Sequence, residues 1–418
     1  MEKNKMKQRL ITVVVLILLS RCFPFDASAQ ESSAVSGYIT IWEHNYSFKD
    51  SLEAVINAFQ DSYPNVEVDY TIKPYGDYDD LLRLSIQAGS GPDLFWTNGT
   101  ATTTMQELVD AGICYNLTDL IDYSFISDNA LALGRVNDSV YSVPWMTMDT
   151  RICYYNIEMF LKNGWKVPKT FEEFETLLAS IKASGVTPIS LSSDPWCILF
   201  IYEPVLAACA PEFSSELQNN NVNITDQPAR DALRTLLQWA KNDYFGSNWL
   251  SMVDSDVQNY TFATGKTAMT VAGSWDAVII SKNNPSLNFG VFAIPAHDGT
   301  SGLVGTAANG FSVNSHSKNL DAAIAFANFC AGEEAQTIWV QKLGAVPGTD
   351  KIEASTDIAK LIVENGDGRV FESWQNVLSH RSPSGEAFSI YEKDIRKVFL
   401  GEVSVDEFMD SISATITQ

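Results

Sequence analysis

Two hydrophobic periods alternate in the first folded segment of this chain, and this alternation restricts the folds that it can adopt. Tyr38–Trp42 is a run of β-branched and aromatic residues, which is typical of a buried strand. The next apolar residues recur at helical spacing, and Asp50 with Glu53 forms a capping-box pattern before a helix that ends at Pro64. Val66–Tyr70 then alternates as a second strand. Such a unit needs a right-handed connection and a parallel sheet, so the chain begins as an α/β fold.

The same pattern recurs further along the chain. Thr170 has the position of a helix N-cap, and Thr187–Leu191 follows that helix as the next strand. Further helices are predicted at Pro228–Asp243 and Leu320–Ala331. Strands that alternate with helices indicate α/β layers rather than a barrel of strands.

The first 29 residues have the three parts of an export signal. Four basic residues precede the apolar run Leu10–Leu19, and Ala27–Ala29 follows as an A-x-A cleavage site. Ten apolar residues extend only about 15 Å as a helix, which is half of a bilayer core. We therefore predict that residues 1–29 are a signal peptide and that the protein is exported.

A second interpretation of the same segment stays open. Leu19–Cys22 resembles a bacterial lipobox, in which the cysteine becomes the lipidated first residue of the mature protein. Arg21 stands where that motif has a small residue. The protein is therefore either released after Ala29 or anchored to the cell surface through Cys22.

Length and charge narrow the classes of partner. A chain of 418 residues is long enough for about two to three domains. Its formal charge is −23, and removal of the signal peptide with its five basic and two acidic residues changes this to −26. A field of this sign repels phosphate backbones and anionic lipids, so nucleic acid and acidic membranes are poor partners. Neutral and cationic ligands remain as the classes of partner that the charge allows.

The sequence has no motif for a metal, a cofactor or a catalytic nucleophile. The cysteines beyond the signal peptide are widely spread without a C-x-x-C pair, so we expect small buried apolar residues and leave one disulfide open. The four histidines are scattered as well, and neither a G-x-S-x-G nor an H-E-x-x-H pattern occurs. A secreted glycosidase remains as an alternative, because it needs only one suitably spaced pair of carboxylates.

Five tryptophans share an unusual position. Each lies at or just after the end of an apolar run, beside acidic or amide residues: Trp42, Trp96, Trp145, Trp196 and Trp275. In open parallel sheets the ligand crevice lies outside the carboxyl ends of the strands, where these rings would converge. Indole faces stack on the C–H face of a sugar, and carboxylates and amides bind its hydroxyls. The pattern favours a sugar site.

Several segments resemble the extracellular solute-binding proteins of ABC importers, specifically the sugar-binding family that includes the maltose-binding protein. They occur in the family's order over nearly the whole mature chain: Gly91–Trp96, Tyr154–Asn156, Val167–Phe174, Gly265–Met269 with Gly273–Trp275, and Gly344–Pro347. The resemblance implies a two-lobed periplasmic-binding-protein fold, each lobe a mostly parallel sheet flanked by helices. It also implies a monomer without a cofactor or enzymatic activity, whose partners are an oligosaccharide and a membrane permease.

Residues that match the family's motifs gain roles by resemblance. Trp96 and Trp275 resemble stacking rings, Asp149 stands six residues before Tyr155 where the family has a sugar-binding acid, and Phe388 matches a further aromatic platform. Asp194 and Trp196 match an acid-Pro-aromatic motif, and Asn98 takes a polar position. Gly99 stands where the maltose binders carry an acid, which argues against maltose itself.

The lobes implied by the resemblance are discontinuous in sequence. We expect an N-terminal lobe of residues 37–147 and 302–343 and a C-terminal lobe of 148–298 and 347–418. The chain would cross between them near Trp145–Asp149, Pro295–Gly302 and Gly344–Gly348. Ligand would bind between the lobes and stabilise their closed form, which the permease recognises.

The sequence thus predicts a binding protein that delivers an oligosaccharide to a permease. The predicted ligand contacts are Trp42, Glu43, Asn45, Trp96, Asn98, Trp145, Asp149, Asp194, Trp196, Trp275, Asp276 and Phe388. A glycosidase, a sensor for a signalling receptor and a binder of a non-sugar solute such as a polyamine remain as alternatives. The sugar and its linkage are not determined by the sequence.

Overall fold

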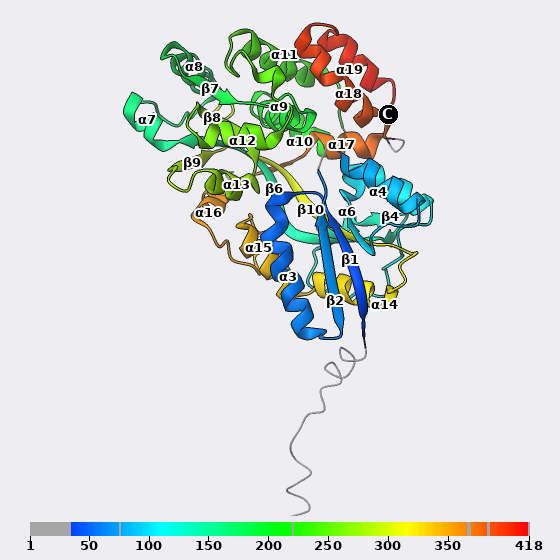
Figure 1. The fold of residues 1–418 in the computed structure, drawn as a ribbon. Coiled ribbons are helices and arrows are strands. Elements are labelled where there is room, and N and C mark those ends of the chain that lie inside the picture. The colour runs from blue at the N-terminus through cyan, green and yellow to red at the C-terminus, as the bar shows by residue number, and fades with distance from the viewer. Residues whose placement is uncertain (1–34, 75–76, 220, 366–368, 383–384, 417–418) are drawn as a thin grey trace, which may run out of the picture.

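A computed structural model describes residues 35–74, 77–219, 221–365, 369–382 and 385–416 (Figure 1). The predicted signal peptide and Cys22 lie outside the described residues. The blue N-terminal elements and the yellow helix α14 form one half of the molecule in Figure 1, and the green middle of the chain and its red C-terminal end form the other.

The chain begins with the expected β-α-β unit. Strand β1 (Gly37–Glu43) pairs in parallel with β2 (Val66–Ile72), and helix α3 (Lys49–Ser62) connects them. The predicted capping box at Asp50 is wrong. Asn45 instead caps a short 3₁₀ turn, η1 (Tyr46–Phe48), which continues into α3, so that Asp50 lies inside the first turn of the helix.

A nine-stranded sheet runs through both halves of the molecule. Its order is β2-β1-β3-β10-β6-β8-β7, with β11 beside β10 and β9 beside β6. The outer pairs β1·β2, β1·β3, β7·β8 and β10·β11 are parallel. The two long strands β6 (Ser142–Asn156) and β10 (Leu303–Val313) are antiparallel to each other and join the outer strands of the two halves. This mixed sheet with helices on its faces confirms the predicted α/β fold class.

The remaining strands are short. They are β3 (Leu94–Trp96), β4 (Arg135–Val136), β5 (Ser139–Val140), β7 (Thr187–Ser190), β8 (Thr267–Gly273), β9 (Phe289–Phe292) and β11 (Val370–Glu372). The predicted helices after Thr170, at 228–243 and at 320–331 are present as α8 (Phe171–Ala183), α11 (Gln227–Lys241) and α14 (Leu320–Ala331). Thr170 caps α8, because its hydroxyl accepts a hydrogen bond from the backbone N–H of Glu173 at 3.3 Å.

The other helices follow the same layered arrangement. In the first half they are α4 (Tyr78–Gln87), η3 (Gly99–Ala101), α5 (Thr104–Asp110) and α6 (Asp128–Leu133). The middle of the chain forms α7 (Ile157–Asn163), α9 (Pro195–Cys209), α10 (Pro211–Gln218), η4 (Trp249–Ser251), α12 (Ser255–Ala263) and α13 (Asp276–Asn283). The last third forms α15 (Glu333–Leu343), α16 (Asp357–Glu364), α17 (Trp374–Arg381), α18 (Glu386–Leu400) and α19 (Val405–Ser413).

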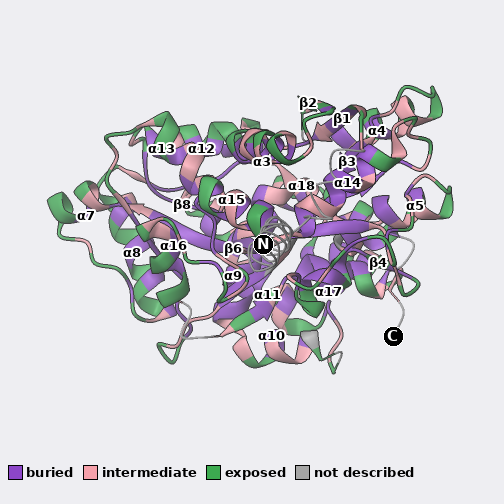
Figure 2. Ribbon diagram, turned by 90° about the horizontal axis from the view of Figure 1, so that it is seen from below, coloured by how far each residue is buried: buried purple, intermediate pink, exposed green. Residues whose placement is uncertain are grey.

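Hydrophobic side chains gather in separate clusters in the two halves. The N-terminal cluster is formed by β1, β3, α3, α14 and α15 with the ends of β6 and β10. The C-terminal cluster is formed by β7, β8, α8, α9, α11 and the last helices α17, α18 and α19. Figure 2 shows the buried strands as purple bands between helices whose outer surfaces are exposed. Each half therefore has its own core, and the long strands connect the two.

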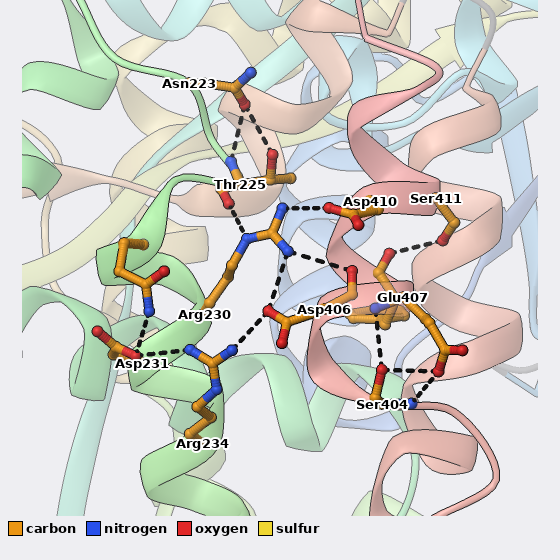
Figure 3. A network of polar contacts seen from close by, with 12 residues as sticks. Asn223, Thr225, Arg230, Asp231, Arg234, Ser404, Asp406, Glu407, Asp410 and Ser411 are labelled. Carbon is orange, nitrogen blue, oxygen red and sulfur yellow. Dashed lines mark hydrogen bonds and ion pairs between the residues drawn. The ribbon is translucent and has the colours of Figure 1, made fainter.

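The last helices are also fixed to the C-terminal cluster by charges. Arg230 and Arg234 on α11 form ion pairs with Asp406 and Asp410 on α19 over 2.6 to 3.3 Å (Figure 3). The backbone carbonyl of Thr225 accepts a further hydrogen bond from Arg230. These contacts bring the end of the chain to the half that its middle forms.

The structure shows the state of the described cysteines and the length of the apolar helices. Among the described cysteines, Cys114, Cys153, Cys197 and Cys330 are buried, Cys209 is half-buried, and none forms a disulfide. Among the described helices, none is by itself long and apolar enough to cross a membrane, and only the bent pair α9 and α10 has the length and composition together. Helix α9 is packed inside the C-terminal cluster.

Candidate functional site

A cavity of about 470 Å³ lies where the two halves meet. Its volume falls in the range of roughly 300 to 1,000 Å³ that is usual for small-molecule sites. We call the side of the first half the N-terminal wall: His44, Asn45, Tyr46, Ser47, Phe48, Pro74, Trp96, Asn98, Leu133, Ala307 and Asn309. We call the opposite side the C-terminal wall: Asp194, Trp196, Cys197, Phe200, Val253–Asp256, Gln258, Asn259, Ala272, Trp275, Asp276, Gln375 and Asn376.

The N-terminal wall is built from the segments that follow β1 and β3. Trp96 ends β3 and is only 4% exposed, because His44 and Trp339 lie nearly parallel to its ring at centroid distances of 5.0 and 6.3 Å. Its Nε1 donates a hydrogen bond to Asn98. Tyr46 is 62% exposed at the same wall. This wall therefore offers the recessed rings of His44, Phe48 and Trp96 and the exposed ring of Tyr46, together with amides.

A buried carboxylate fixes the first loop of that wall. The Oε1 atom of Glu43 lies 2.6 Å from Nδ1 of His44 and accepts hydrogen bonds from the backbone N–H groups of His44 and Asn45. Glu43 itself is fully buried and does not line the cavity. It determines where His44 and Asn45 lie.

The C-terminal wall carries three half-buried rings, Trp196, Phe200 and Trp275. Trp196 lies in the first turn of α9 and Trp275 directly follows β8, and Phe200 contacts both at centroid distances of 6.1 and 5.5 Å. The ring of Trp275 rests on Gly273, where a Cβ atom would lie 2.3 Å from ring carbons. A side chain at this glycine would therefore displace the ring.

Four aspartates stand at the N-termini of three helices in the same wall. Asp194 caps α9 and Asp254 caps α12, each accepting a 2.8 Å hydrogen bond from the backbone N–H two residues later. Asp256 lies in the first turn of α12 and Asp276 in the first turn of α13. Helix N-termini favour negative charge at such positions.

Burial disfavours the charged form of these carboxyl groups. It raises the pKa of Asp276 to about 7, although the N–H of Gly273 and the amide of Asn259 donate hydrogen bonds that oppose the shift. Burial also raises the pKa of Asp194. The pKa of Asp256 is raised by burial and then by the charge of Asp254. The aspartates of this wall are thus close enough to repel one another.

Strand β6 brings an acid and a base to the cavity between the two walls. Burial raises the pKa of Asp149 to about 6, and the neighbouring charge of Arg151 opposes this shift. Arg151 forms a buried ion pair with Glu203 at 3.0 Å, and its guanidinium carbon lies 4.6 Å from the centroid of the Phe200 ring. Glu203 also accepts hydrogen bonds from Ser373 and from the backbone of Gln375, which positions the start of α17.

Eight of the twelve predicted ligand contacts come together in this cavity. They are Asn45, Trp96, Asn98, Asp149, Asp194, Trp196, Trp275 and Asp276. They come from segments that are far apart in sequence, and all but Asp149, which lies within β6, stand at or after the end of a strand or at the start of a helix. Their role in binding remains a prediction.

The structure does not bring the other four to the cavity. Trp145 is 1% exposed, because it stacks on Trp339 at a centroid distance of 4.1 Å within the N-terminal cluster. Phe388 packs behind Trp196 and stacks on Tyr391. The ring of Trp42 lies under the ammonium of Lys73 at 4.1 Å. Glu43, the fourth, is the buried anchor described above.

Several residues that line the cavity are not among the predicted ligand contacts. Two of them, His44 and Tyr46, stand directly beside the predicted contact Asn45. Two others, Asp254 and Asp256, stand at the start of a helix. Their positions resemble those of the predicted contacts and could have indicated them. Arg151 lies inside a strand and Phe200 inside an apolar helix, where their patterns are those of core residues. Only the packing of β6 against α9 shows that both reach the cavity.

The site fits a neutral or cationic solute with both flat and polar faces. Rings, amides and carboxylates line it, and among the described residues no group of three or more histidine, cysteine, aspartate or glutamate side chains could hold a metal ion. A second hollow of about 690 Å³ lies on the first half alone, between α4, α5 and the segment 314–319. It lacks tryptophan among its lining residues and is separate from the cavity between the halves.

Comparison with known proteins places this geometry among binding proteins. The family model described as bacterial extracellular solute-binding protein matches residues 54–362. The chain is 27% identical over 321 residues to the multiple sugar-binding protein of Streptococcus mutans, which covers 75% of each chain. It is 22% identical to the galactooligosaccharide-binding protein of Bacillus subtilis, over 84% of this chain and 82% of that one.

A solved structure shows the same fold. A chitin oligosaccharide binding protein superimposes with a TM-score of 0.75 and 23% sequence identity, over 91% of this chain and 98% of that chain. The likeness extends over both halves and the two long strands that join them.

Proposed function

Since this chain belongs to the bacterial extracellular solute-binding proteins, we propose that it captures an oligosaccharide outside the cytoplasmic membrane. The observation that carries the proposal is the cavity in which Trp96, Trp196 and Trp275 meet carboxylates and amides from both halves. A sugar ring needs both kinds of surface, because its C–H face is apolar and its hydroxyls require donors and acceptors. Two relatives, a multiple sugar-binding protein and a galactooligosaccharide-binding protein, support the same ligand class.

Binding would be coupled to closure of two lobes. We propose the lobes as residues 37–147 with 302–343 and residues 148–298 with 347–418, joined by β6 and β10. Only a closed form offers contacts from both walls to one ligand, so the ligand shifts the population toward it. The closed form would then deliver its sugar to the permease of an ABC importer, with the protein held at the cell surface through Cys22 or released after Ala29.

A thermal-shift screen tests this function. The purified secreted chain is heated with mono- and oligosaccharides, polyamines and amino acids, because a ligand at 100 times its Kd adds about 2.7 kcal/mol of stability. We expect a shift with one oligosaccharide series and recovery of that sugar intact by mass spectrometry. A cleaved sugar would favour a glycosidase, and shifts restricted to non-sugar solutes would overturn the proposal.

Uptake separates a transporter component from a sensor. A strain that lacks this chain should lose growth on the identified sugar and regain it when the chain is restored. Unchanged uptake despite tight binding in vitro would support a sensing role instead.

A further inference from the structure

The C-terminal wall has more acceptors and more negative charge than a neutral sugar requires. Its four aspartates meet no lysine or arginine within that wall among the described lining residues. The nearest base of the cavity, Arg151, is already paired with Glu203 at 3.0 Å in a site where both side chains are buried. The charge of Arg151 is therefore offset by Glu203, not by the aspartates.

Helix ends compensate for only part of this charge. The helices α9, α12 and α13 begin at the wall, and each N-terminus supplies about half a positive charge. Three such ends offset roughly one and a half of the four formal negative charges. Burial raises the pKa of Asp194, Asp256 and Asp276, so the anionic form of each carboxyl group is less favourable in this wall than in water.

Two buried amides of the wall, Gln258 and Asn259, already donate hydrogen bonds within the protein. Both N–H bonds of the Gln258 amide are directed at Thr270 and at the carbonyl of Val271. The amide nitrogen of Asn259 donates to Asp276 at 3.0 Å, and this contact fixes its Oδ1 atom as an acceptor. That oxygen is buried without a hydrogen-bond partner, and Asn259 is 2% exposed. The Oδ1 atom of Asn259 therefore still lacks a donor.

The rings beside the aspartates also suit a cation. The Phe200 ring already lies 4.6 Å from the guanidinium carbon of Arg151, and the Trp275 ring lies 5.8 Å from it. Aromatic faces attract cations within about 6 Å. Trp196 and Trp275 are half-buried on the same wall as Asp194 and Asp276.

We propose that the ligand carries a protonated amine and that the C-terminal wall binds it, so that the substrates are oligosaccharides of amino sugars. This inference rests on the proposed function and names its ligand class. An ammonium group supplies one positive charge to offset the negative charge of the wall, and three donors for the acceptors of its aspartates. The N-terminal wall, whose described lining residues include no carboxylate, would hold the neutral part of the chain.

Calorimetric titration with matched sugars tests the inference. The amino, N-acetylated and hydroxyl forms of the same α- and β-linked oligosaccharides are titrated into the secreted chain at a pH that keeps the amine protonated. We expect the amino form to bind at least about tenfold more tightly than both neutral forms, with a preference that weakens in high salt. Equal or tighter binding of a neutral form would overturn the inference and leave the proposed function standing. Failure of every carbohydrate to bind, with or without binding of spermidine, would overturn both.

Charge-neutralising variants identify the wall. Asp194→Asn retains the helix cap but removes the charge, and we expect the preference for the amino form to fall at least about fivefold. Asp254→Asn provides a second variant at an exposed cap, should the first not fold. The control Asp321→Asn removes the same charge from the first turn of α14, far from the cavity, and should preserve the preference. An unchanged preference in both wall variants would contradict the assignment.

Discussion

Both walls of the cavity present aromatic rings beside polar side chains, but they differ in charge. On the N-terminal wall, amides and a histidine surround the recessed ring of Trp96, and the carboxylate of Glu43 is buried behind the surface. On the C-terminal wall, the rings of Trp196 and Trp275 stand beside aspartates at helix N-termini. The difference indicates that one wall recognises shape and hydroxyls, while the other also recognises charge.

The walls also differ in how their rings are supported. Trp96 lies within a ring cluster with His44, Phe48 and Trp339, so its removal would disturb the N-terminal cluster. Trp275 rests on the bare backbone of Gly273 and contacts Phe200, so that its own ring is more available to a ligand. Removal of the Trp96 ring should therefore mainly lower stability, and removal of the Trp275 ring should mainly weaken ligand binding.

The largest effect is expected for the buried ion pair behind the C-terminal wall. Arg151→Ala leaves Glu203 charged and buried without its partner, which should lower the free energy of unfolding by about 3 to 5 kcal/mol. Urea unfolding measures this. The matched control is Arg234→Ala, which breaks ion pairs with exposed aspartates and should cost no more than about 1 kcal/mol. Similar losses in both variants would mean that the buried pair does not stabilise this wall.

Replacement of the tryptophans tests the difference in support. Trp275→Ala should weaken sugar binding by about 2 kcal/mol, or roughly 30-fold, because it removes a stacking face. Trp96→Ala should instead lower the stability of the protein by about 3 to 5 kcal/mol, because the ring is 4% exposed. Titration calorimetry and urea unfolding on both variants give the two readouts. If Trp96→Ala kept full stability and lost only affinity, the contrast between the walls would be wrong.

The sequence determined much of this arrangement through local patterns. Strand β1 and helix α8 have clear periods and Thr170 is a true cap, so their positions could be predicted. The cap at Asp50 could not, because Asn45 starts a 3₁₀ turn that shifts the beginning of α3.

For the site, the useful signal was a polar residue or ring beside a strand end. This signal found Trp196 and Asp276 but also selected Trp145, whose burial depends on Trp339 from a distant helix. Contacts between segments far apart in sequence decide which ring faces the cavity. A single sequence does not display such contacts.

A smaller effect is expected where the backbone supports a ring. Gly273→Ala places a Cβ atom 2.3 Å from the Trp275 ring, so the ring must move. Overpacking of this kind costs about 1 to 3 kcal/mol, and we expect sugar affinity to fall about tenfold as the stacking face tilts. Calorimetric titration measures the loss. The double variant Gly273→Ala with Trp275→Ala should bind no more weakly than Trp275→Ala alone. An additive loss would show that Gly273 acts independently of the ring.

The smallest effect concerns the pH dependence of stability. Burial raises the pKa of Asp276 to about 7 in the folded protein, above its unfolded value of about 3.9, so the folded state binds more protons between these two values. The contribution of this group to the free energy of unfolding is therefore largest at low pH and falls as pH rises toward about 7, by at most about 1.4 kcal/mol per pH unit. Urea unfolding of the ligand-free protein at several values in this window should show a shallower slope for Asp276→Asn than for the wild type. Asp321→Asn, which removes an exposed aspartate from the opposite half, should keep the wild-type slope. If Asp276→Asn kept it too, the charge on the C-terminal wall would not oppose folding, and the two walls would be electrostatically alike in the absence of ligand.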